Sequence, residues 1–271
     1  MTAGGERPTG HGDRRDRSTF VVLAGGGSRR MGSDKAFLRV GGREMLDRLL
    51  DVGRSACGAC VLAVGDPDPH GRALGRYGWE ETDAPGGPGG ADHRRFRRGD
   101  DALRLVTDRR PGLGPVAGLA AGLGAAPGPL CFVAACDLPF LVPDVVTAAL
   151  GELEELAGGR PGAAARRAVV PVVRDRRQPL AAAYTAGCSD AARRCLEAGE
   201  LSMADLLDRL EEVRTVPASR LIGPDGPGDP ARADRIFTNV NRPEELEAAR
   251  RAAPDAGTGR GPEAGAGGRS R

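Results

Sequence analysis

The single lysine of this chain ends a long glycine-rich loop, and that combination indicates phosphate binding. Of the 271 residues, 39 are Lys or Arg, and Lys35 is the only lysine among them. It closes the segment Leu23-Ala-Gly-Gly-Gly-Ser-Arg-Arg-Met-Gly-Ser-Asp-Lys35, which follows a short apolar run. Glycines let a backbone approach a phosphate chain and direct N–H groups at it. The loop is not of the Walker A type, because Ser33 follows Gly32 where that motif has lysine.

A carboxylate and two amides follow other apolar runs. Asp137 comes directly after the run 130–135, where it is placed for Mg²⁺, a hard ion that takes one or two carboxylates together with phosphate oxygens. A helix N-cap is the alternative interpretation of Asp137. Asn239 and Asn241 are the only asparagines of the chain. Their spacing places both side chains on one face of an extended segment, so one amide can complete a metal shell while the other holds a turn or caps a helix.

Three further polar residues are candidates with weaker signals. Asp108 ends the run 103–107, where it can accept from a base or a ribose or bind a metal, or only cap a turn. Gln178, the single glutamine, is expected beside the site of a second substrate. Arg177 belongs to an arginine cluster before Gln178, which either binds an anionic phosphate group or forms a solvated turn.

Histidine does not supply an obvious base. His11, His70 and His93 lie in a tail, near a loop and in a glycine-rich segment, so no Ser-His-Asp or Cys-His set is visible. Chemistry without such a base fits phosphoryl or nucleotidyl transfer, in which an anionic phosphate attacks and the protein contributes positioning and charge neutralisation.

Short apolar runs alternate with amphipathic segments, which predicts a mostly parallel sheet covered by helices on both faces. We expect strands at 19–24, 60–64, 103–107, 130–135, 168–173, 180–184 (antiparallel), 212–216 and 236–240. We expect helices at 44–54, 116–123, 143–156, 187–198, 203–210 and 243–251. In such a sheet ligands bind beyond the carboxyl ends of the strands, where the candidate residues lie.

Composition narrows the class and the domain organisation. A net charge of +2 and 3% aromatic residues disfavour a nucleic-acid binder, and the absence of a long apolar run excludes a transmembrane helix. The six cysteines are too few for a disulfide scaffold, so a soluble cytoplasmic protein without membrane or nucleic-acid partners is expected. We predict one domain at 18–252, disordered tails at 1–17 and 253–271, and a flexible insertion at 84–101.

Six motifs occur together in the order of one known family. LAGGGSRRMGSDKAFL, DRRPGLGPVAGL, CDLPFL, QPLAAAY, LSMADLL and FTNVNRPEEL resemble the molybdenum cofactor guanylyltransferases, which are nucleotidyltransferases of Rossmann-like, three-layer α/β/α fold. The resemblance spans about 18–251. It implies GTP and molybdenum-bound molybdopterin as substrates, Mg²⁺ as cofactor, and release of pyrophosphate when the terminal phosphate of molybdopterin attacks GTP. It also allows transient contact with molybdopterin-handling or cofactor-receiving proteins.

The resemblance assigns roles to the candidate residues. Lys35 would bind the phosphates and offset charge on pyrophosphate, Asp108 would hold the nucleoside, and Asp137 would bind Mg²⁺ near the α-phosphate. Asn239 and Asn241 would face the metal and the acceptor. The residues that would contact the nucleotide, partly at the guanine edge, are Leu23, Ala24, Gly25 and Gly26. At 64–66 no side chain matches the family's nucleotide contact after the second strand.

The base and the acceptor leave alternatives open. Cytidylyl-transferring relatives usually read LAAG where this chain reads LAGG, so Gly25 favours guanine, because a missing methyl group admits the larger purine. One methyl group is worth only ~1–3 kcal/mol of discrimination. The alternatives are a cytidylyl or sugar-phosphate nucleotidyltransferase and a non-catalytic nucleotide-binding protein of the same fold.

Overall fold

The computed structural model describes residues 14–25, 34–82, 93–108, 112–159, 162, 164–223 and 228–253. The predictions for Gly26 and for most of the two tails lie outside these residues.

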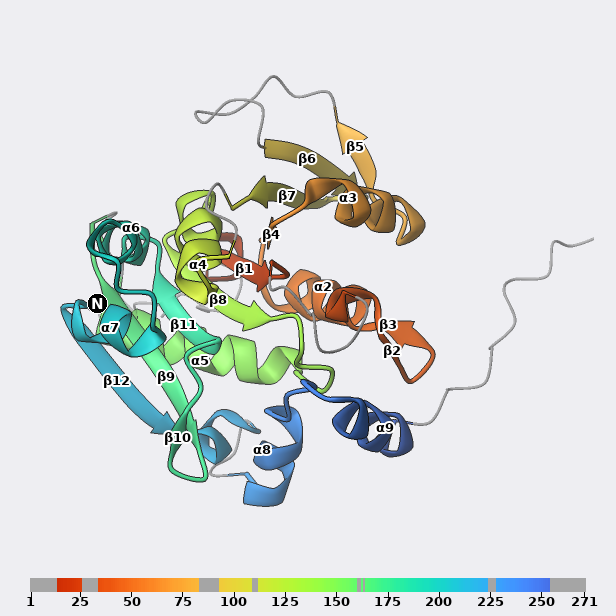
Figure 1. The fold of residues 1–271 in the computed structure, drawn as a ribbon. Helices are drawn as coiled ribbons and strands as arrows, with labels where there is room; N and C mark the ends of the chain where they lie inside the picture. The colour runs from red at the N-terminus through yellow and green to blue at the C-terminus, as the bar shows by residue number, and fades with distance from the viewer. Residues whose placement is uncertain are drawn as a thin grey trace, which may run out of the picture.

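A single large sheet forms the middle layer of the described chain (Figure 1). Its strand order is β10-β9-β11-β8-β1-β4-β7-β6-β5, and β12 pairs with β9. The strands are β1 (Ser18–Leu23), β4 (Ala59–Val64), β5 (Glu80–Thr82), β6 (His93–Arg98), β7 (Asp101–Thr107), β8 (Leu130–Ala135), β9 (Arg167–Val173), β10 (Arg176–Arg177), β11 (Ala181–Thr185) and β12 (Glu212–Pro217). The central pairs β8-β1, β1-β4 and β4-β7 are parallel, which confirms the predicted parallel core.

Helices cover both faces of the sheet. They are α2 (Met45–Ala56), α3 (Pro67–Arg76), α4 (Pro115–Gly124), α5 (Pro143–Leu156), α6 (Cys188–Ala198), α7 (Met203–Asp208), α8 (Pro230–Ile236) and α9 (Pro243–Ala252), with 3-10 turns η1 (Lys35–Phe37) and η2 (Ala218–Leu221). A short hairpin joins β2 (Arg39–Val40) to β3 (Arg43–Glu44). No helix in the described part of the chain is long and apolar enough to cross a membrane.

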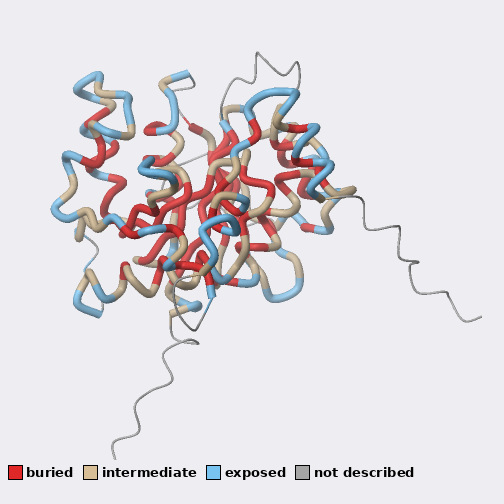
Figure 2. The backbone as a smooth tube through the Cα atoms, turned by 90° about the horizontal axis from the view of Figure 1, so that it is seen from below, coloured by how far each residue is buried: buried red, intermediate tan, exposed pale blue. Residues whose placement is uncertain are grey.

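The alternation of β1 side chains divides the interior into two main layers, because successive side chains of a strand point to opposite faces. Phe20 belongs to a hydrophobic cluster that includes residues of α2 and α5, whereas Val21 belongs to a cluster that includes residues of α4 and α6. Both helices next to β1 approach it through glycine: a Cβ at Gly53 would lie 2.7 Å from Phe20, and one at Gly122 would lie 2.4 Å from Val21. The buried backbone therefore concentrates at the centre of the molecule (Figure 2).

Two expectations about secondary structure are corrected by the structure. Part of the predicted insertion at 84–101 is strand β6, which pairs antiparallel with β5 and β7. Its sequence has no apolar alternation, and only Phe96 is buried, so the strand depends on pairing with its neighbours. The predicted strand at 236–240 is instead the end of α8 and an irregular segment, because Asp229 caps a helix that begins at Pro230. The remaining part of the insertion, 84–92, lies outside the described residues.

The last residues of the predicted N-terminal tail, 14–17, are ordered. Arg14 and Arg17 each donate to Glu154, at 2.7 Å in both cases, so the end of the predicted tail packs on α5. Cys57 and Cys60 are free and buried, and burial raises the pKa of the Cys57 thiol to about 11. The two cysteines are therefore small residues of the core.

Candidate active site at the carboxyl ends of β1 and β8

The parallel register of β1 and β8 brings two candidate segments to one edge of the sheet. Leu23 of β1 stands opposite Ala135 of β8, and Cys136 donates its backbone N–H to the carbonyl of Leu23 at 3.1 Å. The loop after β1 leads to Lys35, and the residue after Cys136 is Asp137. Because both strands end at this edge, residues that are far apart in sequence are neighbours in space.

Lys35, Asp137 and Asn241 meet at this edge. The ammonium of Lys35 lies 3.7 Å from Oδ2 of Asp137 and donates to Oδ1 of Asn241 at 2.6 Å. The side chains of Lys35 and Asp137 are 19% and 17% exposed, so both are partly shielded and still reachable. Asp34 caps the turn that carries Lys35, since its Oδ1 accepts from the N–H of Ala36 at 3.0 Å.

The segment that carries Asn241 is fixed from both ends. Val240 donates its N–H to the backbone carbonyl of Asp137 at 2.9 Å, and the side chain of Val240 is fully buried. On the other side, Oε2 of Glu245 accepts from the N–H groups of Asn241 at 2.6 Å and Arg242 at 3.1 Å. The start of α9 therefore orients the amide of Asn241 toward Lys35.

Burial is the main influence on the pKa of Asp137. Removal from water raises the pKa of its carboxyl, and the nearby Lys35 ammonium opposes this by favouring the charged form. The negative charge of Glu245 adds to the upward shift. The carboxylate is therefore held in a position that costs folding free energy, which is common where a group serves chemistry.

The oxygen donors at this edge fit a hard divalent cation that also binds phosphate. Asp137 offers a carboxylate and Asn241 an amide oxygen, both ligand types that Mg²⁺ accepts. In the described part of the chain no cluster of three or more His, Cys, Asp or Glu side chains could hold a metal ion. A cation at Asp137 could take further oxygens from water and from a substrate phosphate, as Mg²⁺ does in nucleotide sites.

Two cavities adjoin at Asp137. The smaller, of about 290 Å³, is lined by Leu23, Gly25, Lys35, Gly114, Pro115, Gly118, Ala135, Cys136, Asp137 and Leu180. The larger, of about 550 Å³, is lined by Ala135, Asp137, Leu138, Arg176, Arg177, Gln178, Pro179, Leu180, Ala181, Met203, Asn239, Asn241 and Glu245. Because Asp137 belongs to both walls, the arrangement can hold two molecules with their reacting ends at one carboxylate.

The cavities separate the candidate residues into two groups. Leu23, Gly25 and Lys35 line the smaller cavity, and all three weak acceptor candidates, Arg177, Gln178 and Asn239, line the larger one together with Asn241.

Two candidates lie away from these walls. Ala24 is buried and donates its N–H to the carbonyl of Ala63 at 2.9 Å. Asp108 is also buried, at the end of β7, and its N–H bonds the carbonyl of Val64 at 2.8 Å. Neither residue lines either cavity. Gly26 is outside the described residues.

Gly25 is constrained by the neighbouring strand. A Cβ at this position would lie 3.1 Å from the backbone nitrogen of Gly65 and 3.4 Å from the carbonyl carbon of Val64. An alanine would thus press on the backbone that follows β4. Glycine at this position has a packing reason that is independent of the size of a bound base.

Glu245 and Arg176 also line the larger cavity; Arg176 belongs to the arginine cluster noted before Gln178, whereas Glu245 was not singled out from the sequence. Glu245 is the third residue of a helix that begins at Pro243, and its carboxylate accepts from the backbone N–H of the N-cap residue Arg242. A capping signal of this kind is readable in sequence, but its proximity to Asp137 is not.

Comparison with known proteins is consistent with this geometry. The family model described as "MobA-like NTP transferase domain" matches residues 20–213. The molybdenum cofactor guanylyltransferase of Desulfosudis oleivorans is 30% identical over 236 residues, covering 86% of this chain and 95% of that protein. The probable molybdenum cofactor guanylyltransferase of Pelotomaculum thermopropionicum is 30% identical over 244 residues, covering 90% and 97%.

Solved structures show the same fold. Molybdopterin-guanine dinucleotide biosynthesis protein A from Archaeoglobus fulgidus has a TM-score of 0.63 at 24% identity, covering 86% of this chain and 97% of that one. The structure of CMP:2-keto-3-deoxy-manno-octonic acid synthetase complexed with CTP has a TM-score of 0.59 at 13% identity, covering 88% of this chain and 98% of that one. At these identities the likeness concerns the fold alone, which enzymes with different acceptors share.

Proposed function

The chain belongs to the family of MobA-like NTP transferase domains, and on this premise we propose that it transfers GMP from GTP to molybdenum-bound molybdopterin. The products are the guanine dinucleotide form of the cofactor and pyrophosphate. The observation that carries this proposal is the position of Asp137 between two cavities, with Lys35 and Asn241 in contact. The names of the relatives favour guanine and molybdopterin as the transferred base and the acceptor.

In this reaction Lys35 neutralises phosphate charge. Its ammonium is compact and reaches both Asp137 and Asn241, so it can shift toward a phosphate oxygen when a triphosphate enters the smaller cavity. Catalysis of nucleotidyl transfer is mostly positioning and charge stabilisation. A single ammonium on a flexible stem suits that task better than the planar fork of arginine.

Asp137 and Asn241 would hold Mg²⁺ between the two cavities. When bound, the ion supplies positive charge that stabilises the phosphates during transfer. Burial raises the pKa of the Asp137 carboxyl and so favours its neutral form. A bound cation would oppose this effect by favouring the charged carboxylate. Glu245 keeps Asn241 in place through the two backbone bonds described above.

The larger cavity suits an anionic acceptor. Arg176 and Arg177 line it, and no ion pair joins either guanidinium to a carboxylate among the residues that the structure describes. The turn between β9 and β10 contains Arg174 and Asp175, whose φ angles are 46° and 60°. Arg174 forms an ion pair with Asp234 of α8 at 2.7 Å, which holds this turn in place. Within the described chain, no carboxylate therefore competes with the phosphate of molybdopterin for these two arginines.

Transient contact with proteins that supply molybdopterin or receive the finished cofactor is part of the same proposal. This part is supported by the similarity of the chain to molybdenum cofactor guanylyltransferases, because a cofactor that such an enzyme finishes must pass to another protein.

The test is pyrophosphate release from each of the four nucleoside triphosphates, with Mg²⁺ and molybdenum-loaded molybdopterin. We expect release with GTP that requires both the acceptor and Mg²⁺. A preference for CTP rejects the guanylyl assignment but keeps nucleotidyl transfer. Nucleotide binding without turnover for any acceptor supports a non-catalytic protein instead.

A further inference from the structure

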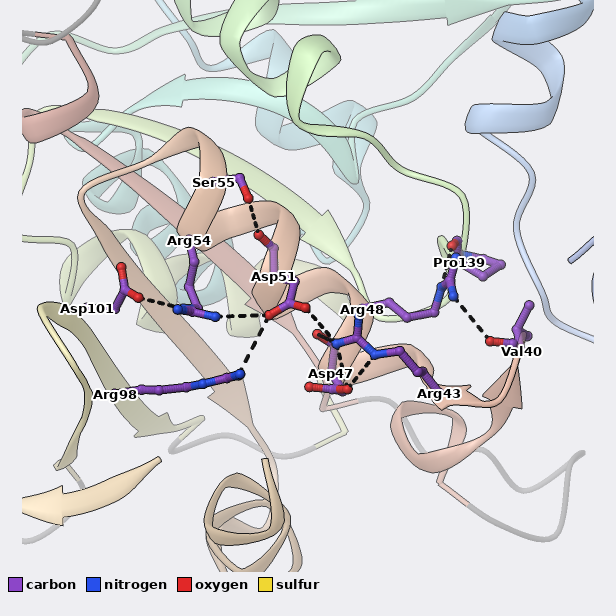
Figure 3. A network of polar contacts seen from close by, with 10 residues as sticks. All are labelled: Val40, Arg43, Asp47, Arg48, Asp51, Arg54, Ser55, Arg98, Asp101 and Pro139. Carbon is purple, nitrogen blue, oxygen red and sulfur yellow. Dashed lines mark hydrogen bonds and ion pairs between the residues drawn. The ribbon is translucent and has the colours of Figure 1, made fainter. Parts of the chain in front are cut away.

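Arg48 is a partly buried arginine of α2 that bonds backbone carbonyl groups instead of carboxylates. Its Nε donates to the carbonyl of Pro139 at 3.1 Å, and its Nη1 donates to the carbonyl of Val40 at 3.4 Å. Figure 3 shows the side chain extending from α2 toward these two carbonyls. Within the described residues no ion pair joins Arg48 to an acidic side chain.

The neighbouring arginines of the same region behave differently. Arg43 pairs with two carboxylates of α2, those of Asp47 and Asp51, each at 2.7 Å. Arg54 pairs with Asp51 at 3.1 Å and with Asp101 at the start of β7 at 2.6 Å. These contacts form a network of ion pairs beside Arg48 (Figure 3), and Arg43 and Asp51 line the same small cavity as Arg48 and Pro139. Arg48 differs from these arginines because its hydrogen bonds go to backbone carbonyls and not to carboxylates.

Placing the Arg48 guanidinium here has an energetic cost. Burial lowers its pKa by disfavouring the charged form, and the positive charge of Arg43 lowers it further. A buried charge without a carboxylate partner is tolerated only when hydrogen bonds replace its lost hydration. Bonds from a charged donor are stronger than neutral ones, and the rigid fork of arginine can hold two acceptors in one fixed geometry.

The two carbonyls belong to the two segments that carry the candidate active-site charges. Val40 is in β2, which follows the turn of Lys35, and Pro139 follows Asp137 by two residues. The small hydrophobic cluster that includes Val40, Phe140 and Val240 packs these segments together with the segment of Asn241. Arg48 therefore bridges the Lys35 and Asp137 segments from outside both cavities, since it lines neither.

We propose that Arg48 is a positioning residue that fixes the separation between Lys35 and Asp137. It does not touch a substrate, and it acts through the backbone of the two segments that it joins. The proposal rests on the proposed function for its kinetic measurement, because that measurement is guanylyl transfer. A misplacement of about 1 Å at a reacting centre can cost a factor of roughly a hundred in rate, so a small widening is enough to be measured.

The experiment compares Arg48→Met with Arg54→Met. Both changes remove a guanidinium from α2 while keeping an unbranched side chain, but only the first releases Pro139 and Val40. We expect Arg48→Met to lower kcat roughly tenfold to a hundredfold with the KM for GTP altered by less than about threefold. Arg54→Met, which loses its ion pairs with Asp51 and Asp101, should keep kcat within about twofold of wild type.

A second variant and a second measurement make the result decisive. Arg48→Lys keeps the charge but cannot span both carbonyls with one ammonium, so its kcat should fall between those of wild type and Arg48→Met. Equal losses of kcat in Arg48→Met and Arg54→Met contradict the proposal. If Arg48→Met does not fold, a wild-type kcat in Arg48→Lys contradicts it instead. Crystal structures of the wild type and of either Arg48 variant measure the distance between Lys35 and Asp137 directly. An unchanged distance between Lys35 Nζ and Asp137 Oδ2 overturns the positioning role even if the wild-type protein transfers no guanylyl group.

Discussion

The ammonium of Lys35 lies 3.7 Å from the carboxylate of Asp137, and the two residues come from the loops after adjacent parallel strands. Asn241 completes the group by accepting a hydrogen bond from the same ammonium at 2.6 Å. The three residues stand where the smaller and larger cavities meet. Their roles can be separated by substitutions that change one property at a time.

Lys35→Arg preserves the charge of the only lysine but replaces a compact ammonium by a planar, larger guanidinium. We predict that kcat falls roughly a hundredfold, because the new group cannot occupy the short space between Asp137 and Asn241. The measurement is pyrophosphate release at saturating GTP, with folding checked by thermal denaturation. Turnover at the wild-type rate would show that a positive charge alone is sufficient at this position.

Asp137→Asn should separate stability from activity in the metal-free protein. Because burial raises the pKa of Asp137, the folded protein binds its proton more tightly than the unfolded chain does. Folding is therefore penalised once pH rises above the unfolded pKa, and the penalty is complete above the folded pKa.

The neutral amide of Asp137→Asn avoids this penalty, so the variant should gain Tm relative to wild type as pH rises from the ordinary Asp range to neutrality. Guanylyl transfer should fall at least roughly a hundredfold in the same variant, since the metal-binding carboxylate is lost. Thermal denaturation at several pH values, in the presence of a metal chelator, tests the predicted gain in Tm. A Tm difference that becomes more negative with rising pH contradicts it.

Glu245→Ala should loosen the segment that carries Asn241. It removes the acceptor for the N–H groups of Asn241 and Arg242, and loss of a helix cap typically costs ~1 kcal/mol of unfolding free energy. We expect that loss together with a lower kcat, whereas Glu245→Gln keeps a carbonyl acceptor and should be milder. Urea denaturation and steady-state kinetics measure the two effects. Glu244→Ala, an exposed neighbour in the same first turn, is the control and should leave kcat unchanged.

Arg176→Ala and Arg177→Ala should affect the acceptor and not the nucleotide. Both side chains line the larger cavity and not the smaller one. We therefore expect the KM for molybdopterin to rise roughly tenfold or more for each variant, the value of one hydrogen bond to a charged group, with an unchanged KM for GTP. Arg194→Ala, an exposed arginine of α6, controls for net charge. A rise in the KM for GTP of equal size would place the arginines at the nucleotide instead.

Gly25→Ala tests whether this glycine selects the base. Because a Cβ would press on the backbone of Gly65, we expect weaker binding of GTP and CTP to a similar degree and a lower Tm. The ratio of the two affinities should stay within about threefold, less than the discrimination that one methyl group can give at a base. A selective loss of GTP binding, measured by thermal-shift titration, would instead support selection by base size.

The parallel core could be predicted because its strands are continuous apolar runs that end in glycine or aspartate. The meeting of Lys35 with Asp137 also follows from sequence, since the carboxyl ends of parallel strands share one edge. The edge of the sheet could not be predicted in this way. Strand β6 is rich in arginine and is held by pairing with β5 and β7, a non-local contribution that periodicity does not report.

The end of the chain misled the sequence interpretation for a related reason. Ile236, Phe237 and Val240 are buried, and an apolar run of this kind is typical of a strand. The cap at Asp229 and the proline at 230 start a helix instead, so these residues reach the core from a helix end and an irregular segment. The contribution of Glu245 was missed because its contact with the backbone of Asn241 depends on the path of that segment.

The most direct measurement follows the two ends of GTP separately, with label on the α-phosphate in one reaction and on the γ-phosphate in another. With wild-type protein, Mg²⁺ and molybdenum-loaded molybdopterin, we predict that the α label moves into the acceptor and the γ label appears in pyrophosphate. Lys35→Arg and Asp137→Asn should both abolish most of the α transfer. Movement of the γ label to the acceptor, or undiminished α transfer in both variants, would contradict guanylyl transfer at the junction of the two cavities.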